Sequence, residues 1–222
     1  LVAAGELPKE FLEVPLVSAN VTPKASSFPA VKRYVIKEYQ LAGKGAMRLS
    51  VGITGLLFDP EERISRTEFQ IEKPETAARA VIEELENKTN FRIILTDMTV
   101  GKAISLAVTV PGINLVLVSH NYAAIADPQE VGGTLVVLSV NEGRMLNEVR
   151  LALDPVTSKM NLATRFIQLD AAIPDDPVMG ELQRKAQAAV DELKKQKSSV
   201  VPGEQPGAQI AKSKARIQDL LT

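Results

Sequence analysis

The sequence predicts an α/β protein in which mixed β-sheets are flanked by helices and a helical tail follows at the C-terminus. Stretches with apolar residues at every third or fourth position alternate with short apolar runs of strand length. A helical stripe over 74–87 is followed by an apolar strand over 91–95, and a weaker helical stripe leads to a strand over 113–120. Because the crossover between two such strands is right-handed, they should be parallel neighbours. Strands over 32–41 and 47–57, joined by a glycine-containing turn, predict an antiparallel hairpin and hence a mixed sheet.

Length and composition exclude several classes of protein. The 222 residues suit one large domain, or one domain with an appendage, and 45% hydrophobic with 24% charged residues is typical of a soluble globular chain. The 26 basic and 27 acidic residues give no net attraction for nucleic acid, so we do not expect a nucleic-acid partner. Without cysteine there is no disulfide, no thiolate metal site and no cysteine nucleophile. No apolar run reaches the roughly 18 residues that a membrane span needs.

The predicted organisation is one α/β domain over 1–197, a linker over 198–207 and a C-terminal helix or tail over 208–222. The chain begins with Leu1 rather than Met and has no basic and apolar leader, so we expect a processed or excised product.

The remaining helices and the first strand follow from the same patterns. Residues 14–21 predict a buried strand. The weaker helix should turn four residues inward: Ala103, Ile104, Ala107 and Val108. A long helix before the linker, with Asp176 as N-cap and Pro177 at its first position, runs to about Lys197. Its predicted buried stripe consists of Val178, Leu182, Ala186, Ala189 and Leu193.

Three strands are predicted between these parts. Residues 134–140 form a continuous apolar run. Apolar and polar residues alternate over residues 145–153, so one face of that strand should be exposed to solvent. Residues 159–170 form the third strand, in which the alternation slips near Arg165 and Phe166. We therefore expect a bulge or a strand end at that point.

Polar residues stand where the predicted strands end. They are Asn20, Asp97, Ser119, His120, Asn121 and Tyr122. In open α/β sheets, ligands bind outside the carboxyl ends of the strands, so Asp97 and His120 fall where a metal or a substrate would be held. The alternatives are a hydrogen-bonded histidine without a metal, and an aspartate that caps a loop or pairs with a cation. His120 is the only histidine.

Other enzyme classes fit poorly. A catalytic Ser-His-Asp triad would have to consist of Ser119, His120 and Asp97. Ser119 and His120 are neighbours on a strand, however, and neighbouring residues of a strand point to opposite faces. The sequence also has no Gly-x-Ser-x-Gly elbow. The absence of a Gly-x-Gly-x-x-Gly motif leaves a dinucleotide site unsupported.

The series of strand motifs resembles the 5′-nucleotidase branch of the calcineurin-like metallophosphoesterases. The motifs are Val17-Ser-Ala-Asn-Val21, Tyr34-Val-Ile-Lys-Glu38, Leu49-Ser-Val-Gly-Ile-Thr-Gly-Leu56, Ile94-Leu-Thr-Asp97, the run from Val110-Pro-Gly112 to Ser119-His120, and Gly133-Thr-Leu-Val-Val137. The resemblance covers roughly residues 14–170 and corresponds to the second half of that family's catalytic domain. It implies a metallophosphoesterase-like α/β sandwich that is incomplete on its N-terminal side.

The resemblance also implies a set of metal ligands. In the family, one strand end supplies a Ser-His histidine, and a later Gly-His-x-His or Gly-His-x-Gln supplies two further ligands. Here Asp97 stands in the first place, His120 matches in the second, and Tyr122 replaces a ligand. Carboxylate oxygen suits Mn or Mg, whereas a phenol with a pKa near 10 is a poor ligand at neutral pH. The family's Asp-x-His, Gly-Asp and Gly-Asn-His motifs do not occur in this sequence.

Two functions therefore compete. One is a degenerate, non-catalytic domain with a structural or partner-binding role. The other is the C-terminal half of a phosphomonoesterase or 5′-nucleotidase that uses Mn, Zn or Mg, with its other metal ligands outside this chain. If strands of the sheet are missing, an unpaired edge should be covered by another protein chain or by the N-terminal half. The resemblance implies a periplasmic or extracellular location.

Overall fold

The computed structural model describes residues 14–25, 28, 30–41, 47–64, 68–119, 127–139, 145–154, 157 and 160–198. The chain divides into two compact units, Leu1–Leu169 and Asp170–Thr222. The predicted domain over 1–197 spans the first unit and most of the helix of the second. The predicted linker over 198–207 and tail over 208–222 lie almost wholly outside the described residues.

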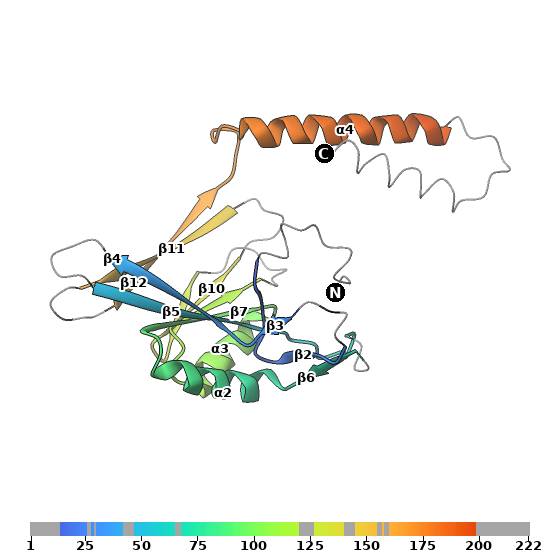
Figure 1. Cartoon of the computed structure of the whole chain (residues 1–222). Helices are drawn as coiled ribbons and strands as arrows, with labels where there is room; N and C mark the ends of the chain where they lie inside the picture. Colours follow the sequence, from blue (N-terminus) through green and yellow to red (C-terminus); the bar gives the residue numbers. More distant parts are fainter. Residues whose placement is uncertain are drawn as a thin grey trace. The chain divides into compact units, whose positions relative to one another are not determined.

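A six-stranded mixed sheet forms the centre of the first unit (Figure 1). Its order is β4 (Val35–Leu41), β5 (Met47–Leu56), β7 (Phe91–Thr96), β8 (Leu115–Val118), β10 (Thr134–Leu138) and β9 (Gln129–Val131). The four inner strands are parallel to one another, and the edge strands β4 and β9 run antiparallel to their neighbours. The predicted α/β fold with a mixed sheet, an antiparallel hairpin and parallel neighbours β7 and β8 is confirmed.

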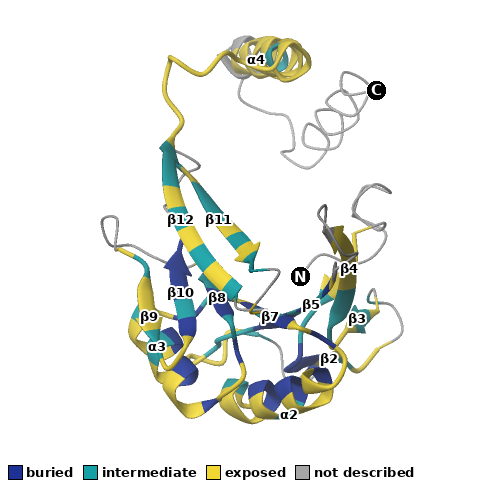
Figure 2. Cartoon of the chain, turned by 90° about the vertical axis from the view of Figure 1, so that its left-hand side faces the viewer, coloured by how far each residue is buried: buried dark blue, intermediate teal, exposed yellow. Residues whose placement is uncertain are grey.

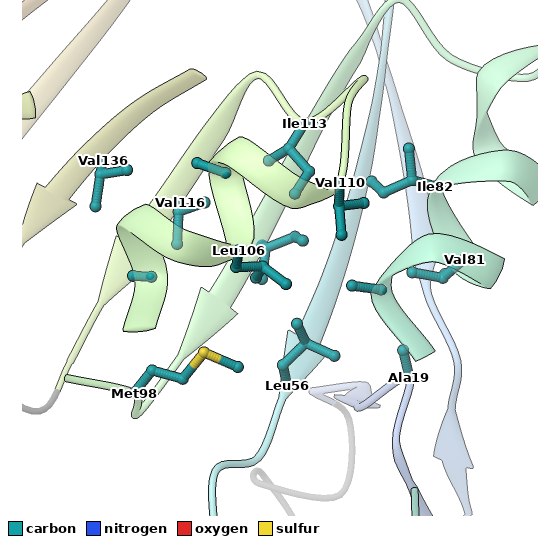
Figure 3. Packing of buried hydrophobic residues seen from close by; sticks show 14 of the residues in the cluster. Ala19, Leu56, Val81, Ile82, Met98, Leu106, Val110, Ile113, Val116 and Val136 are labelled. Atoms are coloured by element: carbon teal, nitrogen blue, oxygen red, sulfur yellow. The ribbon is translucent and has the colours of Figure 1, made fainter. Parts of the chain in front are cut away.

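Two helices cover one face of this sheet. α2 (Pro74–Glu86) buries the whole predicted stripe, which is Ala77, Ala78, Val81, Ile82 and Leu85. α3 (Val100–Thr109) packs Leu106 beside sheet residues such as Val116, and Figure 3 shows the resulting core. The predicted inner face of α3 is partly wrong, because the helix buries Leu106 and leaves Val108 62% exposed. Gly112, at φ 91°, makes the turn into β8 and lies against Ile82.

The N-terminal residues form two short strands instead of one. β1 (Leu16–Val17) pairs in parallel with β3 (Val31–Lys32), and β2 (Val21–Pro23) pairs antiparallel with β6 (Phe69–Ile71). The predicted single buried strand over 14–21 is therefore wrong, and Val14 is largely exposed. Asn20, between β1 and β2, bonds through its side chain to the backbone of Leu57 and Glu72.

A long hairpin packs on the other face of the sheet (Figure 2). It consists of β11 (Met145–Leu153) and β12 (Met160–Gln168), and its inner residues include Val149, Leu151 and Leu162. The predicted bulge near Arg165 is wrong, because the pairing runs without interruption from Met145 with Gln168 to Leu153 with Met160. Ile167 keeps the alternation and lies opposite Leu146 on the outer face.

The hairpin covers the second face of the sheet only in part. The first residues of the strands, Leu49, Val51, Phe91 and Leu115, are buried beneath it. Farther along the same face, Ile53 and Ile93 are half-buried and Leu95 is 41% exposed. Among the described residues, β4 pairs on one side only, with β5.

The second unit contains one described element, α4 (Pro177–Ser198). Asp176 caps it as predicted, since its Oδ1 accepts hydrogen bonds from the N–H groups of Val178 and Met179 at 2.9 and 3.0 Å. The prediction that its apolar stripe is buried is wrong, because Val178 is 73% exposed and Leu182 is 41% exposed. No helix of the described residues has the length and apolar character to cross a membrane.

Candidate functional site

The polar residues predicted at the strand ends belong to neighbouring strands. Asp97 directly follows β7, and Ser119 directly follows β8. These strands are parallel neighbours, so their carboxyl ends meet at one edge of the sheet. His120, Asn121 and Tyr122 lie outside the described residues. The site is therefore described by Asn20, Asp97 and Ser119.

Asn20 is a structural residue. The residue is 2% exposed, and its Oδ1 accepts hydrogen bonds from the Leu57 N–H at 2.8 Å and the Ser18 hydroxyl at 3.2 Å. Its Nδ2 donates to the carbonyl oxygens of Leu57 at 2.8 Å and Glu72 at 3.1 Å. An amide has two donor protons and one acceptor oxygen, and all of them are used here. Asn20 thus joins three segments and has little capacity left for a ligand.

Asp97 joins two strand ends. Its Oδ1 accepts the N–H of Phe58 at 2.7 Å, just beyond the end of β5. The residue is half-buried. One carboxylate oxygen is therefore engaged with the backbone just beyond the end of β5. Asp97 is oriented by this contact whether or not it has a second partner.

Ser119 repeats a contact found at the next strand. Its N–H and its hydroxyl both donate to the carbonyl of Thr96, at 2.8 and 3.2 Å. Ser139, which follows β10, makes the same pair of bonds to the carbonyl of Val118, at 2.8 and 3.2 Å. Each serine thus satisfies the last free carbonyl of the preceding parallel strand. The sequence pattern did not identify Ser139, although it follows an apolar strand as Ser119 does.

Two features outside the strand ends were not found by sequence reasoning. On the outer face of the hairpin, Glu148 accepts hydrogen bonds from Arg150 at 2.6 Å and from Arg165 at 2.8 Å. These guanidinium groups, Arg150 first, hold the pKa of the Glu148 carboxyl below its ordinary value. On the inner face, Asn147 donates to the carbonyl of Leu138, and its buried Oδ1 has no partner among the described residues. Both depend on the strand register, which the sequence alone does not give.

Solved structures with a similar fold include a 5′-nucleotidase, a calcineurin-like phosphoesterase and a sulfate thiohydrolase. A 5′-nucleotidase precursor of Thermus thermophilus aligns with a TM-score of 0.66 and 21% identity, over 82% of this chain and 40% of its own. A calcineurin-like phosphoesterase of Bacillus subtilis aligns with a TM-score of 0.63 and 18% identity, over 82% of this chain and 64% of its own. The sulfate thiohydrolase of Thermus thermophilus aligns with a TM-score of 0.63 and 19% identity, over 83% of this chain and 34% of its own.

The chain has the calcineurin-like phosphoesterase fold. It spans less than two thirds of the length of each of these three proteins. Such partial matches fit the resemblance to the C-terminal half of the 5′-nucleotidase branch. No protein-family model matches the sequence, and no curated protein does.

The phosphoesterase fold implies divalent metal, and the described side chains can be tested against that requirement. A two-metal site needs several carboxylate, imidazole or amide ligands that converge from different strand ends. Among the described residues, no three His, Cys, Asp or Glu side chains come together in this way. The amide of Asn20 is occupied, and one oxygen of Asp97 binds the Phe58 N–H. These residues do not make up a metal centre.

Proposed function

We propose that this chain is a degenerate 5′-nucleotidase-like phosphoesterase domain that does not hydrolyse phosphate esters on its own and has a structural or partner-binding role. The observation that supports this most directly is the use of the strand-end side chains. Asn20, Asp97 and Ser119 each hold backbone groups of neighbouring segments together. At these positions the polar side chains bond to the backbone of the same domain, and these hydrogen bonds stabilise the fold.

The sequence at the same edge supports the proposal. Only one histidine is present, and by resemblance Asp97 and Tyr122 stand where the family has metal ligands. Oxygen ligands alone suit hard cations, and the phenol is a weak ligand at neutral pH. His120 and Asp97 remain the residues that would hold a Mn, Zn or Mg ion if one binds.

The partner-binding role rests on the incompletely covered sheet. Within the described part of the chain β4 pairs on one side only, and the second face presents partly exposed apolar side chains from Ile53, Ile93 and Leu95. An exposed edge beside an apolar face favours the addition of further polypeptide. We propose that another protein chain, or an N-terminal half of the same fold, covers this region. By resemblance to exported nucleotidases, we place the protein in the periplasm or outside the cell.

The first test is metal analysis of the purified chain, combined with hydrolysis of a chromogenic phosphomonoester in the presence of Mn or Zn. We expect no stoichiometric metal and no hydrolysis above buffer. Stoichiometric metal that is lost in the His120→Ala variant, together with hydrolysis, would overturn the proposal and favour the enzyme.

A matched pair of variants separates the two roles of Asp97. Asp97→Asn keeps an oxygen that accepts the Phe58 N–H, whereas Asp97→Ala removes it. If Asp97 is structural, the asparagine variant should keep the wild-type stability and the alanine variant should lose about 1–3 kcal/mol. Equal stability of all three proteins, with metal binding that depends on the carboxylate, would contradict this role.

A further inference from the structure

α4 presents an apolar stripe that nothing in the described part of its unit covers. The stripe runs the length of the helix at spacings of three and four residues and consists of Val178, Leu182, Ala186, Ala189 and Leu193. All residues whose burial is described on this helix are exposed, except that Gly180 and Ala189 are half-buried. Helices of this kind gain most of their stability by packing an amphipathic face against a partner. The stripe is therefore a candidate contact surface.

We propose that a second copy of this chain covers the stripe, with the two α4 helices antiparallel about a two-fold axis close to Ala186. The positions of the stripe are nearly symmetric about this residue. In an antiparallel pair, Val178 falls opposite position 193 of the second copy, and Leu182 falls opposite Ala189. Because alanine is small, the two helices can approach closely at the axis. An interface with a two-fold axis requires such a self-complementary patch.

The distribution of charge favours the antiparallel arrangement. Asp175 and Asp176 stand at the start of the helix, whereas Lys194, Lys195 and Lys197 outnumber Asp191 and Glu192 near its end. Antiparallel helices bring the acidic start of each copy beside the basic end of the other. Parallel helices would bring the lysines together, and like charges in close register are unfavourable.

Coverage of the stripe by residues 208–222 of the same chain is the competing outcome, and it predicts a monomer. The inference concerns the second unit and does not depend on the proposed function of the first.

The first experiment measures the mass of the whole chain by light scattering during size-exclusion chromatography. We expect twice the 24.0 kDa of one chain. Leu182→Lys places a charge in the stripe and should give a monomer. Gln187→Lys makes the matched change on the opposite face of the helix, where Gln187 bonds to Asp191, and should leave the dimer intact. A monomeric wild type, or a dimer unaffected by Leu182→Lys, would overturn the proposal.

The second experiment determines the orientation of the helices. The sequence contains no cysteine, so each introduced thiol is the only one in the chain. Under mild oxidation, Ala186→Cys should form a disulfide-linked dimer, and Val178→Cys alone should not. A mixture of the Val178→Cys and Leu193→Cys variants should cross-link as a heterodimer. Cross-linking of Val178→Cys alone as efficiently as Ala186→Cys would show parallel helices and refute the antiparallel dimer.

Discussion

Asn20 holds three segments of the chain together through one side-chain amide. Its partners belong to Leu57 and Glu72, which are 37 and 52 residues away along the chain. Asn20→Ala leaves two carbonyls and one N–H without partners at a buried position, so we expect a loss of about 3 kcal/mol in the free energy of unfolding. Urea denaturation measures this loss. Asn161→Ala, on the exposed face of β12, is the control and should change stability by about 0.5 kcal/mol or less.

Gly55 illustrates a close approach between two backbones. A Cβ at this position would overlap the carbonyl oxygen of Val17, which cannot move as a side chain would. The Gly55 carbonyl also accepts the N–H of Ala19 at 2.8 Å. We expect Gly55→Ala to lower the free energy of unfolding of the first unit. The loss should be several times the roughly 1 kcal/mol by which glycine and alanine differ in a helix.

Gly101, in the first turn of α3, is the matched control for this change. A Cβ at Gly101 meets nothing within 4 Å, so Gly101→Ala should raise stability by about 0.5–1 kcal/mol. Thermal unfolding of the two variants should move in opposite directions. If both variants shifted the midpoint of thermal unfolding in the same direction, the close approach of Val17 would not be what excludes a side chain at position 55.

Glu148 makes the stability of the hairpin depend on pH. Its pKa is lowered first by the hydrogen bond from Arg150 and further by Arg165, against an ordinary value of 4.5. A carboxyl whose pKa is lowered by folding stabilises the fold above its unfolded pKa, and this stabilisation is lost as the pH falls through the folded pKa. We expect the wild type to lose more stability than Glu148→Gln as the pH drops below 4.5.

Carboxyl NMR titration provides the direct measurement for this residue. The Glu148 resonance should titrate below the ordinary glutamate value of 4.5. A Glu148 midpoint at or above 4.5 would contradict the predicted direction.

At the scale of single residues, the sequence predicted the place of the polar strand ends but not their role. Asp97 and Ser119 follow buried strands as expected, because the apolar runs before them are unambiguous. The hydrogen bonds of Asn20 could not be predicted from the sequence, because its partners belong to distant segments whose positions depend on the fold.

At the scale of elements, β7 places two adjacent residues in opposite environments. Ile94 is 0% exposed beneath the helices, and its neighbour Leu95 is 41% exposed on the partly covered face. Leu95→Gln should therefore change the stability of the isolated chain by about 0.5 kcal/mol or less. Ile94→Gln buries an unsatisfied amide in the core and should cost several kcal/mol. Chemical denaturation of both variants checks this pair.

The same pair reports on the proposed partner surface. Binding of a hydrophobic dye to the isolated chain should decrease in Leu95→Gln if the uncovered strip is accessible. A large loss of stability in Leu95→Gln would show that this face is already packed within the chain, and the proposed partner site would fail.

The elements that the sequence predicted well have strong local patterns. α2 begins at Pro74, and its stripe of alanines and aliphatic residues has no competing face. α3 is apolar on more than one side, so its buried face could not be chosen from spacing alone, and Val108 proved exposed. The stripe of α4 was correctly placed on the helix, but a pattern gives no information on whether a partner for it exists within the chain.

At the scale of the whole molecule, the chain consists of two compact units with different stabilising interactions. The first unit has a buried core between helices and sheet, and the described part of the second is a single helix. Separate compact units can unfold separately. This division was not predicted from the sequence, in which residues 1–197 form one expected domain, because no glycine-rich or low-complexity linker separates β12 from α4.

Substitutions confined to one unit should leave the other unchanged. A Cβ at Gly180, within α4, meets nothing within 4 Å, so Gly180→Ala should stabilise the helix by about 1 kcal/mol. Amide hydrogen exchange of the whole chain should then slow in α4 by about fivefold and stay the same in β7 and β8. Asn20→Ala should do the reverse, with faster exchange in the sheet and no change in α4. Slower exchange in β7 caused by Gly180→Ala would show that the two units unfold as one.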